Sequence, residues 1–468
     1  MTTGTAGQDV AADIEVHDPA TGELVGRVRP AGPEQVDDAV GRALAAAPGW
    51  ARTSPADRAG MVRDAAGTLR GVAEELARLN ETETGRPYDD GLGGVLAAAG
   101  TLEQYAELGP LHRGRSLQGG WGATDLMVHV PRGVVGVLTP WNDPVAVAAG
   151  LLGAALVTGN TVVHKPSERC PHLGRRFADL LAEHLPDGVL SVVDGAGPTG
   201  ALIAGHDALD LVAHVGSIAA GRSIAQAAAG TGAKVLLENG GNDPLIVDAG
   251  VDPRWAAEQV ALGSYANGGQ VCVSVERVYC HRDVAEPFLA ALAEEATRWV
   301  YRPSAPGEKA LGPLVDRRQR EHVHAHVAAA IAAGATVHVG GAVPDGPGAF
   351  YPATVLSGLT GDMAILREET FGPVAPVRVV DDFDAALAEA VDDPHGLAAT
   401  VLTPDMEHAQ RAWRELPVGT VKINAAFGGA PGGAAEPRGL SGTGFGYGPE
   451  LLDEFATTKV VHLAPPGP

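Results

Sequence analysis

Three residues of the 468-residue chain are of types that together could perform nucleophilic chemistry on a carbonyl group. Cys272 follows the glycine-rich turn 267–270, and a cysteine thiolate is a strong nucleophile where nearby amides lower its pKa. Glu238 closes an apolar run, an unusual place for a carboxylate unless it is paired or reacts. Asn142 follows the apolar segment 133–138, and its neutral amide suits an oxyanion. Taken singly, a buried structural cysteine, a solvated acid and a turn asparagine explain these residues at least as well.

Three further patterns could bind a phosphate or a sugar. The segment GAGPTG at 195–200 matches the pattern GxGxxG, in which glycines let the backbone approach a pyrophosphate. In GSIAAG at 216–221, Ser217 could cap a helix and offer free amides to an anion. In KPSE, Lys165 and Glu168 stand three residues apart at the end of a predicted strand and could hold ribose hydroxyls. Turn chemistry, a plain helix cap and a surface ion pair are the respective alternatives.

Alternating strands and helices must position these residues. Short β-branched runs predict strands at 133–138, 160–165, 189–194 and 209–215. The segments between them predict helices at 144–159, 173–184 and 198–205. This alternation predicts a parallel, doubly wound α/β sheet, with Asn142 at the carboxyl edge where such proteins bind ligands. Long amphipathic helices are expected elsewhere, at 56–80, 252–265 and 285–299.

The composition disfavours several classes of function. Thirty-four basic and fifty-seven acidic residues give a net charge of −23, which opposes binding to nucleic acid and to anionic membranes. The charge-free segment 144–163 has roughly the length of a membrane span, but glycines interrupt it and favour a βαβ crossover. The amino terminus lacks a secretory pattern. Three cysteines without CxxC spacing predict a reducing, cytoplasmic setting with no disulfide framework and no metal site.

From about Val16 to Leu463, the ordered motifs of the chain resemble those of the aldehyde dehydrogenase superfamily. They are ETGRP (83–87), GVVGVLTPWN (133–142), GNTVVHKPSE (159–168), VGSIAAGRSI (215–224), LLENGGNDP (236–244), GGQVC (268–272), GPLV (312–315), EETFGPV (368–374) and HGLAATV (395–401). The resemblance implies an α/β fold with doubly wound parallel sheets in a cofactor-binding and a catalytic domain. A small β element would serve oligomerisation.

The resemblance also implies domain boundaries. These are 1–113 and 131–239 for the cofactor-binding domain, 240–445 for the catalytic domain, and 114–130 and 446–468 for the oligomerisation element. Strands expected near 116–130 and 457–463 would form a flap too small to bury its own face. A homodimer or a homotetramer is therefore expected.

By this resemblance, Cys272 is the nucleophile that attacks an aldehyde carbon. The Asn142 side-chain amide and the Cys272 backbone amide would hold the oxyanion of the thiohemiacetal. After hydride transfer to the cofactor, Glu238 would activate the water that hydrolyses the thioester, and it could deprotonate Cys272 earlier. The expected reaction is oxidation of a small-molecule aldehyde to its carboxylic acid.

The expected cofactor is NAD, with NADP as the alternative. The resemblance implies that Lys165 and Glu168 bind the adenosine ribose, and that Glu369 and Phe371 hold the nicotinamide ribose and ring. The other implied contacts are Trp141, Ser167, Gly216, Ser217 and Gly221, of which Ser217 and the region of Trp141 meet the pyrophosphate. Glu168 predicts a preference for NAD, because a carboxylate accepts the 2′ hydroxyl but repels a phosphate, unless Arg169 or Ser167 receives that phosphate.

Several positions depart from the family pattern. Val215 removes a threonine hydroxyl near the cofactor. Asn239 and Asn242 alter an ELGGK-type run, and the Asn239 side chain has no obvious partner. The segment EPRGL at 436–440 replaces the usual carboxy-terminal motif, so its contacts cannot be carried over. Asp143 replaces an aromatic residue and would disfavour anionic semialdehydes, unless it turns away and pairs with a basic residue.

Two other functions fit the same fold. A CoA-acylating relative would resolve the thioester with CoA, but such relatives usually lack the glutamate that Glu238 supplies. A catalytically silent scaffold would be expected to have lost Cys272, Glu238 or Asn142, and all three are present. The substrate itself cannot be read from the sequence.

Overall fold

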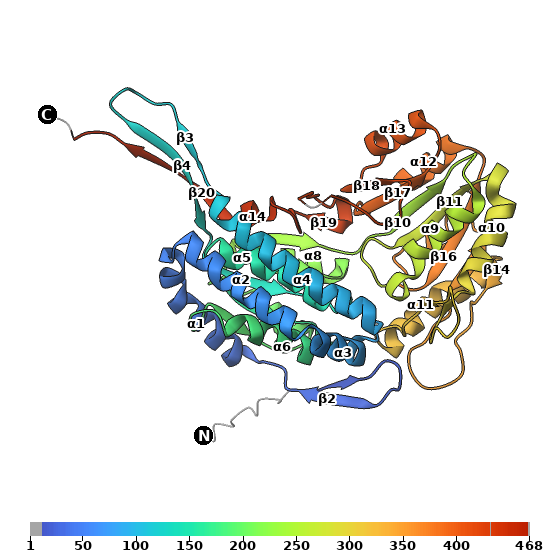
Figure 1. Cartoon of the computed structure of the whole chain (residues 1–468), viewed down its shortest axis with the longest axis horizontal. Helices are drawn as coiled ribbons and strands as arrows, with labels where there is room; N and C mark the ends of the chain where they lie inside the picture. The colour runs from blue at the N-terminus through green and yellow to red at the C-terminus, as the bar shows by residue number, and fades with distance from the viewer. Residues whose placement is uncertain (1–11, 431, 467–468) are drawn as a thin grey trace, which may run out of the picture.

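The computed structural model describes residues 12–430 and 432–466. Two α/β units lie side by side, and a three-stranded arm projects from the first of them (Figure 1). The first eleven residues, on which the prediction about a secretory signal partly rests, lie outside the described part, as do the last two residues of the proline-rich carboxy terminus.

The first sheet has six strands in the order β19-β9-β8-β5-β6-β7. They are β5 (Val134–Leu138), β6 (Thr161–Lys165), β7 (Leu190–Val192), β8 (Leu211–Val215), β9 (Lys234–Glu238) and β19 (Gly442–Thr443). All neighbours are parallel except β19, which pairs antiparallel with β9. The connecting helices are α5 (Pro144–Val157), α6 (Pro171–Ala182), α7 (Gly197–Ala204) and α8 (Ile218–Thr231). The predicted doubly wound α/β sheet is confirmed.

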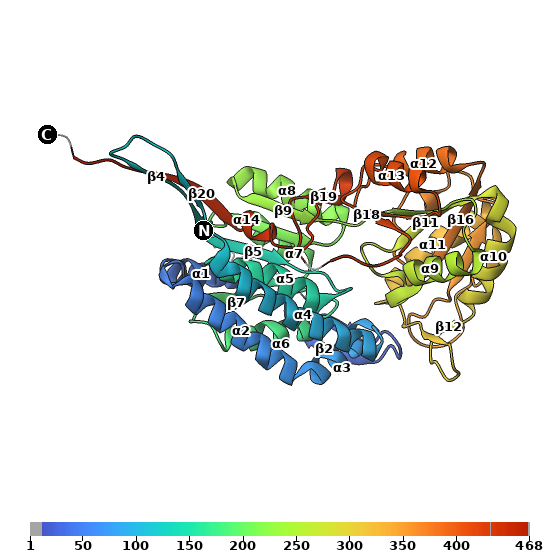
Figure 2. The same cartoon turned by 45° about the horizontal axis from the view of Figure 1, so that its top comes forward.

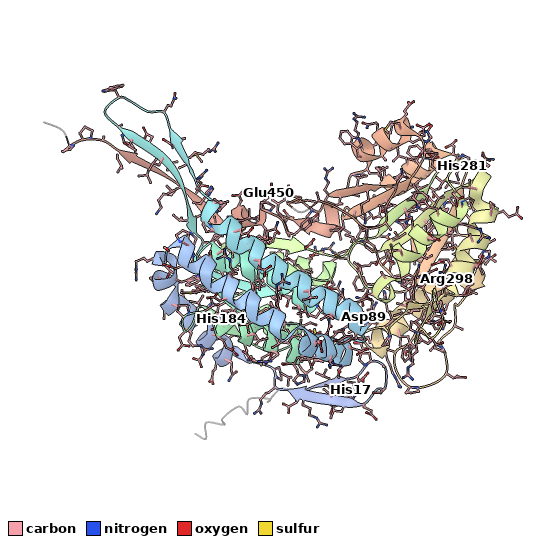
Figure 3. The ribbon with its side chains drawn as sticks, viewed as in Figure 1. His17, Asp89, His184, His281, Arg298 and Glu450 are labelled. Carbon is pink, nitrogen blue, oxygen red and sulfur yellow. The ribbon has the colours of Figure 1, made fainter. Side chains whose placement is uncertain are left out.

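A hairpin and four helices precede this sheet. They are β1 (Ile14–His17), β2 (Leu24–Val28), α1 (Pro33–Arg52), α2 (Pro55–Gly71), α3 (Ala73–Thr84) and α4 (Tyr88–Leu108), followed by the 3₁₀ turn η1 (Gly109–Leu111). Helices α2, α3, α4 and α5 share one hydrophobic core. The α4 helix reaches toward the second unit at its first turn, where Asp89 lies (Figure 3).

The single long helix predicted at 56–80 is wrong. The structure has two helices there, because Val72 leaves the helical conformation with φ −116° and ψ 16°. Gly71 precedes the break, and glycine is a poor helix former. The apolar periodicity nevertheless continues across the break, since Leu69 and Leu76 both enter the same core. Periodicity alone therefore could not reveal the break.

The second sheet has seven strands in the order β14-β15-β16-β11-β10-β17-β18. They are β10 (Asp243–Val247), β11 (Val275–His281), β14 (Thr336–Val339), β15 (Thr354–Ser357), β16 (Val374–Val380), β17 (Ala398–Leu402) and β18 (Thr420–Ile423). Only the β14–β15 pair is antiparallel. Its helices are α9 (Pro253–Tyr265), α10 (Arg282–Ala296), α11 (Arg317–Ala332), α12 (Phe383–Val391) and α13 (Met406–Glu415). Shorter elements are β12 (Trp299–Val300), β13 (Lys309–Ala310), η2 (Ala266–Gly269), η3 (Ala364–Leu366) and η4 (Gly439–Ser441).

The arm is a third sheet, of order β20-β4-β3. It joins β3 (Arg115–Leu117) and β4 (Thr124–Pro131) to β20 (Ala456–Leu463), which follows the short helix α14 (Leu451–Glu454). The arm extends away from both units in two views (Figures 1 and 2). Trp121, Val460 and Leu463 are exposed on it. The expected pairing of these strands is observed, whereas their role in oligomerisation stays a prediction, as do the domain boundaries.

The charge-free segment 144–163 forms the 14-residue helix α5 and the beginning of β6, as the crossover interpretation predicts. Most of the α5 side chains are buried in the first core. Within residues 12–430 and 432–466, no helix has both the length and the apolar character needed to cross a membrane.

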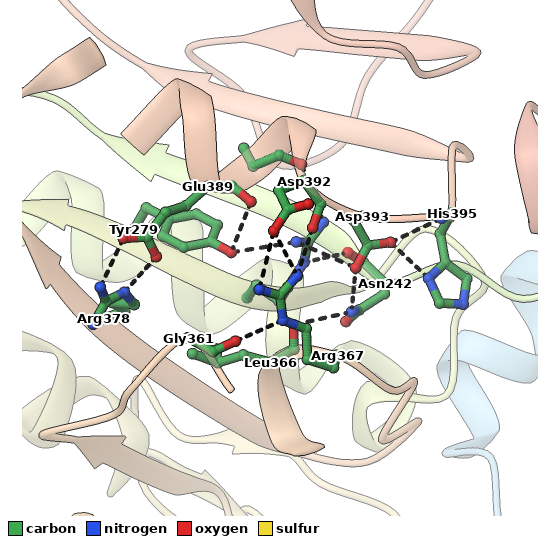
Figure 4. A network of polar contacts seen from close by, with 12 residues as sticks. Asn242, Tyr279, Gly361, Leu366, Arg367, Arg378, Glu389, Asp392, Asp393 and His395 are labelled. Carbon is green, nitrogen blue, oxygen red and sulfur yellow. Dashed lines mark hydrogen bonds and ion pairs between the residues drawn. The ribbon is translucent and has the colours of Figure 1, made fainter. Parts of the chain in front are cut away.

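A buried polar network fixes the beginning of the second sheet (Figure 4). Arg277 is 2% exposed, its Nε donates to the Asn242 carbonyl (2.7 Å), and its Nη1 lies 3.4 Å from the Asp393 carboxylate. Asn242 Nδ2 and His395 Nδ1 contact the same carboxylate at 3.1 and 2.6 Å. Burial alone would raise the pKa of Asp393, but the hydrogen bond with His395 and the Arg277 charge lower it below its usual value. Asn242, predicted to depart from the family pattern, is thus a fixed member of this network.

Removing Asp393 should destabilise the second unit, because Asp393→Ala leaves a buried guanidinium unpaired, a change that costs about 3–5 kcal/mol. Asp392→Ala is the matched control. The Asp392 side chain is 76% exposed in its pair with Arg367, and such surface pairs contribute about 0–1 kcal/mol. Thermal unfolding followed by circular dichroism should give a clearly lower midpoint for Asp393→Ala only. Equal midpoints for the two variants would contradict the role assigned to the network.

Candidate active site

A cavity of about 630 Å³ lies where the two units meet. This volume falls within the range of about 300–1,000 Å³ that is typical of sites for small ligands and cofactors. Every site residue proposed from the sequence lines the cavity except Gly221.

The first sheet contributes the carboxyl ends of its parallel strands to the cavity. Asn142 follows β5, Lys165 ends β6, Gly216 and Ser217 follow β8, and Glu238 ends β9. The chain proceeds from β5 outward through β6 and then returns to place β8 on the other side of β5. Parallel α/β sheets bind ligands at such a reversal.

The second sheet contributes the opposite ends of its strands. Cys272 comes shortly before β11, and Glu369 and Phe371 come shortly before β16. These residues therefore lie on irregular chain at the amino ends of parallel strands. The alternation of strands and helices in the sequence did not predict this arrangement.

The turn before Cys272 has a left-handed backbone. Asn267, Gly268 and Gly269 have φ values of 51°, 65° and 72°, a region that glycine and asparagine adopt more readily than other residues. A Cβ atom at Gly269 would also collide with the Gly372 carbonyl. In addition, Asn267 Nδ2 donates to the Asn142 carbonyl oxygen (3.1 Å). The turn therefore links the loop of Cys272 to the loop of Asn142.

The environment of Cys272 is acidic. Burial raises the pKa of the Cys272 thiol well above its ordinary value, and the charges of Glu238, Asp243 and Glu369 raise it further. The condition for a strongly nucleophilic thiolate, a pKa lowered by nearby amides, is therefore not met in the ligand-free chain. At neutral pH the thiol form dominates, so a nucleophile must be generated by removal of its proton.

Glu238 is poised for proton transfer. Burial raises its pKa to about 7. A carboxyl group with this pKa is a base just above neutral pH and an acid just below it. The carboxylate packs against Gly446, where a Cβ atom would collide with it. The sequence pattern did not single out Gly446.

A buried acid and base lie near Cys272. Asp243 is 3% exposed, and its Oδ1 accepts a hydrogen bond from the Ala398 amide (3.0 Å). Burial raises the pKa of Asp243 to about 8, against the smaller opposing effects of that amide and of the Lys422 charge. Burial also lowers the pKa of Lys422, although Asp243 and Cys272 favour its charged form. Lys422 therefore lies close to both Asp243 and the Cys272 thiol, and burial opposes its charged form.

Asp143 is paired in the structure. Its carboxylate lies 3.0 Å from Arg86 Nη1, and the same guanidinium nitrogen donates to the Asn142 carbonyl (3.0 Å). The alternative in which Asp143 turns to a basic residue is therefore the one observed. Arg86 and Asn267 both hold the Asn142 carbonyl, so the peptide that carries the oxyanion amide is restrained from two sides.

The Lys165 region forms another part of the cavity. Lys165 Nζ donates to the carbonyls of Pro166 (2.9 Å) and Gly195 (2.8 Å) and lies 4.0 Å from the Glu168 carboxylate. Burial lowers the pKa of Lys165, and the Glu168 charge opposes this effect. The pair therefore lies at the cavity rather than on the open surface. The segment 195–200 contributes Gly197 and Gly200 to the same wall.

Aromatic and basic groups converge on Trp141. The Phe371 ring meets the Trp141 ring edge-on, with centroids 5.5 Å apart, and the Arg169 guanidinium lies 5.0 Å from the Trp141 centroid. Arg169 also lies 3.4 Å from Asp316. Ser167, Trp141 and Phe371 all line the cavity with Arg169.

Ser217 caps α8, since its Oγ accepts a hydrogen bond from the Ala220 amide (3.3 Å). It lines the cavity as well. Gly221, by contrast, does not reach the cavity. It lets α8 pack against Asn239, whose Oδ1 would collide with a Cβ atom at this position. The Asn239 Nδ2 donates to the Leu440 carbonyl (3.0 Å), so this side chain has a partner that the sequence did not reveal.

Gln319, His322 and His214 also line the cavity. The first two lie on α11, which no sequence motif marked as part of a site. His214 has two buried ring nitrogens without a hydrogen-bond partner among the described residues. Burial and the Lys165 charge lower its pKa to about 4, so the ring is neutral at neutral pH. His214 adjoins Val215, which departs from the family pattern, but the sequence predicted no role for it.

One group in the described part of the chain could hold a metal ion. His112, His129 and Asp453 have ligand atoms within 4.8 Å of one another, at the base of the arm. His112 Nε2 is already paired with Asp453 (2.7 Å), and the two imidazole rings are stacked with centroids 4.4 Å apart. This group lies outside the cavity described above.

Comparison with known proteins assigns the fold and the site to a family. The family model described as "Aldehyde dehydrogenase family" matches residues 5–461. The chain belongs to the aldehyde dehydrogenase family. The resemblance carried by the sequence motifs and the α/β fold that it implies are confirmed, as is the prediction of an enzyme of this family.

Three similar proteins illustrate the relationship. A betaine aldehyde dehydrogenase of Cereibacter sphaeroides (strain ATCC 17029 / ATH 2.4.9) is 34% identical over 465 residues, which cover 97% of this chain and 94% of the relative. A 3,6-anhydro-L-galactose dehydrogenase solved in complex with NAP has a TM-score of 0.93 at 32% identity, covering 97% and 96% of the two chains. An aldehyde dehydrogenase from Bacillus cereus, solved as an NAD+ complex, has a TM-score of 0.92 at 32% identity, covering 97% and 93%.

Alkylation should distinguish Cys272 from the other two cysteines. Iodoacetamide should modify Cys272 in the native chain, because Cys170 and Cys280 are both 0% exposed. The rate should rise from roughly pH 6 to pH 9, since the raised thiol pKa keeps the thiolate fraction small over that range. Peptide mass spectrometry locates the label, and all three cysteines should react in denaturant. A rate that is already maximal at pH 7 would show that the pKa is not raised.

Proposed function

We propose that the chain oxidises an aldehyde to its carboxylic acid with NAD(P)+ through intermediates bound to Cys272. The observation that carries this proposal is the lining of one cavity by a thiol, an asparagine and a carboxyl group of pKa about 7. Membership of the aldehyde dehydrogenase family supports the class of reaction.

Each reactive residue has a separate role in this proposal. The Cys272 sulfur attacks the aldehyde carbon as its proton passes to the Glu238 carboxylate, which then releases it to solvent, and the Asn142 side-chain amide and the Cys272 backbone amide donate hydrogen bonds to the oxyanion. A bound nicotinamide cofactor would supply the hydride acceptor, and Cys272 would then hold the acyl group as a thioester. Glu238 takes a proton from the water that attacks this thioester, and the acid and the free thiol are released.

The cavity has groups suited to a dinucleotide. Lys165, Ser167 and Glu168 would hold the adenosine ribose at the end of β6. Trp141, Gly216 and Ser217 would lie along the pyrophosphate, where the beginning of α8 favours negative charge. Glu369 and Phe371 would hold the nicotinamide ribose and ring next to Cys272. Similar proteins solved with NAP and with NAD+ support this assignment.

We expect NAD to be preferred to NADP. The Glu168 carboxylate lies near Lys165 and can accept a hydrogen bond from a 2′ hydroxyl, whereas it would repel a 2′-phosphate. Arg169 is directed to Trp141 and Asp316, which leaves it less suited to receive that phosphate.

The acidic surroundings of Cys272 bear on the substrate. Glu238, Asp243 and Glu369 all raise the thiol pKa, which indicates a negative potential at the reacting carbon. Neutral or cationic aldehydes should therefore react better than anionic semialdehydes. Asp143 contributes less to this selection than an unpaired carboxylate would, because it is paired with Arg86.

Two alternatives are less well supported. A CoA-acylating enzyme has no need for the carboxyl group that Glu238 places at the cavity. A catalytically silent scaffold would not need Cys272, Glu238 and Asn142.

We also propose a cytoplasmic location, which the small number of cysteines favours, and a homodimer or homotetramer formed through the arm.

The proposal is tested by measuring reduced-nicotinamide absorbance with a panel of aldehydes. Wild type should oxidise an amino-aldehyde and a neutral aliphatic aldehyde faster than succinic semialdehyde. Cys272→Ser should lose oxidation by at least about a thousandfold while it still binds NAD+, because a serine hydroxyl has a far higher pKa. Cys170→Ala serves as the control for loss of a cysteine elsewhere. Turnover by Cys272→Ser that approaches the wild-type value would exclude this nucleophile.

Glu238→Gln should slow thioester hydrolysis more than any earlier step, because it keeps the shape of the side chain but removes the base. Intact-mass spectrometry should then detect an acyl adduct on the protein. In wild type the rate of this hydrolysis should rise with pH through about 7, since the base is the deprotonated form. That rise should be absent in Glu238→Gln. A wild-type profile that is flat between pH 6 and pH 8, or an unchanged variant, would remove Glu238 from this role.

A further inference from the structure

We infer that Glu276 is a positioning residue that holds the loop Glu369–Phe371 in the cavity, and that it thereby controls how the nicotinamide end of the cofactor is bound. This inference rests on the proposed function. Glu276 lies on β11, outside the lining of the cavity, so it acts through the loop and not by contact with substrate or cofactor.

The loop cannot hold its own shape. It lies between η3 and β16 and belongs to neither a helix nor a strand. Phe371 has a φ of 51°, a left-handed conformation that is strained for a residue with a large side chain. A strained backbone persists only where surrounding contacts fix it.

Glu276, on β11, supplies such contacts to the loop. Its side chain is buried, with 5% exposure. Its Oε2 accepts a hydrogen bond from the Thr370 amide (3.0 Å), and its Oε1 accepts one from the Phe371 amide (3.0 Å). Each carboxylate oxygen therefore holds one of two consecutive amides. Burial and the Glu369 charge raise the pKa of Glu276 well above its ordinary value, against the opposing effect of the two amides, so the loop is held by the geometry of these two hydrogen bonds and not by a fixed charge.

Residues of α11 hold the other side of the loop. Gln319 Nε2 donates to the carbonyls of Thr370 (3.4 Å) and Phe371 (3.1 Å). His322 Nε2 donates to the Glu369 carbonyl (3.2 Å). The backbone groups are thus bound by side chains from two different elements, and Glu276 is the acceptor for both amides.

The loop carries two side chains into the cavity. The Glu369 carboxylate accepts a hydrogen bond from the Gly241 amide (3.2 Å), and the Phe371 ring packs edge-on against Trp141. The adenosine side of the cavity, formed by Lys165 and Glu168, is held by separate contacts at the end of β6. Loss of Glu276 should therefore disturb one end of the cofactor site and leave the other intact.

The test compares binding of NAD+ and AMP to Glu276→Gln by isothermal titration calorimetry. Glutamine has the same length, but it turns an NH₂ group toward one of the two amides and so removes the acceptor for that amide. The dissociation constant for NAD+ should rise at least about tenfold, because one buried amide of the loop is left without its partner, while that for AMP should not change. Glu276→Asp, which keeps the carboxyl group but is too short to reach both amides, is a second variant in case the first does not fold.

Two controls separate positioning from general damage. Glu295→Gln removes another buried carboxylate, which lies on α10 and pairs with Arg298 and with Lys309 of β13, not with the loop. It should lower stability without changing the ratio of the two dissociation constants. Hydrolysis of p-nitrophenyl acetate needs Cys272 and Glu238 but no cofactor, so it should proceed at the wild-type rate in Glu276→Gln.

The outcomes distinguish this inference from the proposed function. An unchanged dissociation constant for NAD+ in Glu276→Gln and Glu276→Asp, or an equal loss of AMP binding, overturns the positioning role. Failure of the wild-type chain to bind NAD+ or to oxidise any aldehyde overturns the proposed function instead.

Discussion

Burial of negative charge is the constraint on which the rest of the site depends. Glu238, Asp243 and Glu369 gather around Cys272, and burial raises the pKa of each of these carboxyl groups. Three ionised carboxylates in so small a volume would repel one another strongly. This repulsion is limited because the acids hold their protons up to about neutral pH. The site therefore favours groups that exchange protons near pH 7.

The same constraint shapes the reaction that the cavity can support. The pKa of the Cys272 thiol lies far above that of Glu238, so transfer of the proton from sulfur to the carboxylate is unfavourable in the ligand-free chain. Attack on a carbonyl becomes feasible if the new negative charge is stabilised as it forms. Asn142 is suited to that task, because Arg86 and Asn267 fix its carbonyl and thereby restrain the loop that carries its amide. For attack on the carbonyl, the restraint on this loop is consequently as important as the acidity of the Cys272 thiol.

The sequence predicted the first sheet better than it predicted the site. The central strands of the first sheet, β5, β6 and β8, are buried throughout and mostly apolar, and burial on both faces produces that pattern directly. The break at Val72 was missed, since both helices face one core and the apolar period continues across it. The raised pKa of the Cys272 thiol left no local signal, because burial, its main cause, and the carboxylates that add to it depend on residues distant in sequence. Gln319, His322 and Glu276 left no local signal for the same reason.

The irregular chain at the amino ends of the second sheet explains why such residues are needed. Strands and helices satisfy their backbone groups internally, whereas the turn 239–242 and the loop 369–371 must borrow partners from side chains. The side chains of Ser441, Glu369 and Arg277 bind the Gly240 carbonyl, the Gly241 amide and the Asn242 carbonyl of that turn. Glu276 and Gln319 do the same for the loop. Buried polar residues therefore occur beside the irregular segments that lie between the two sheets. The reacting groups lie on these same irregular segments.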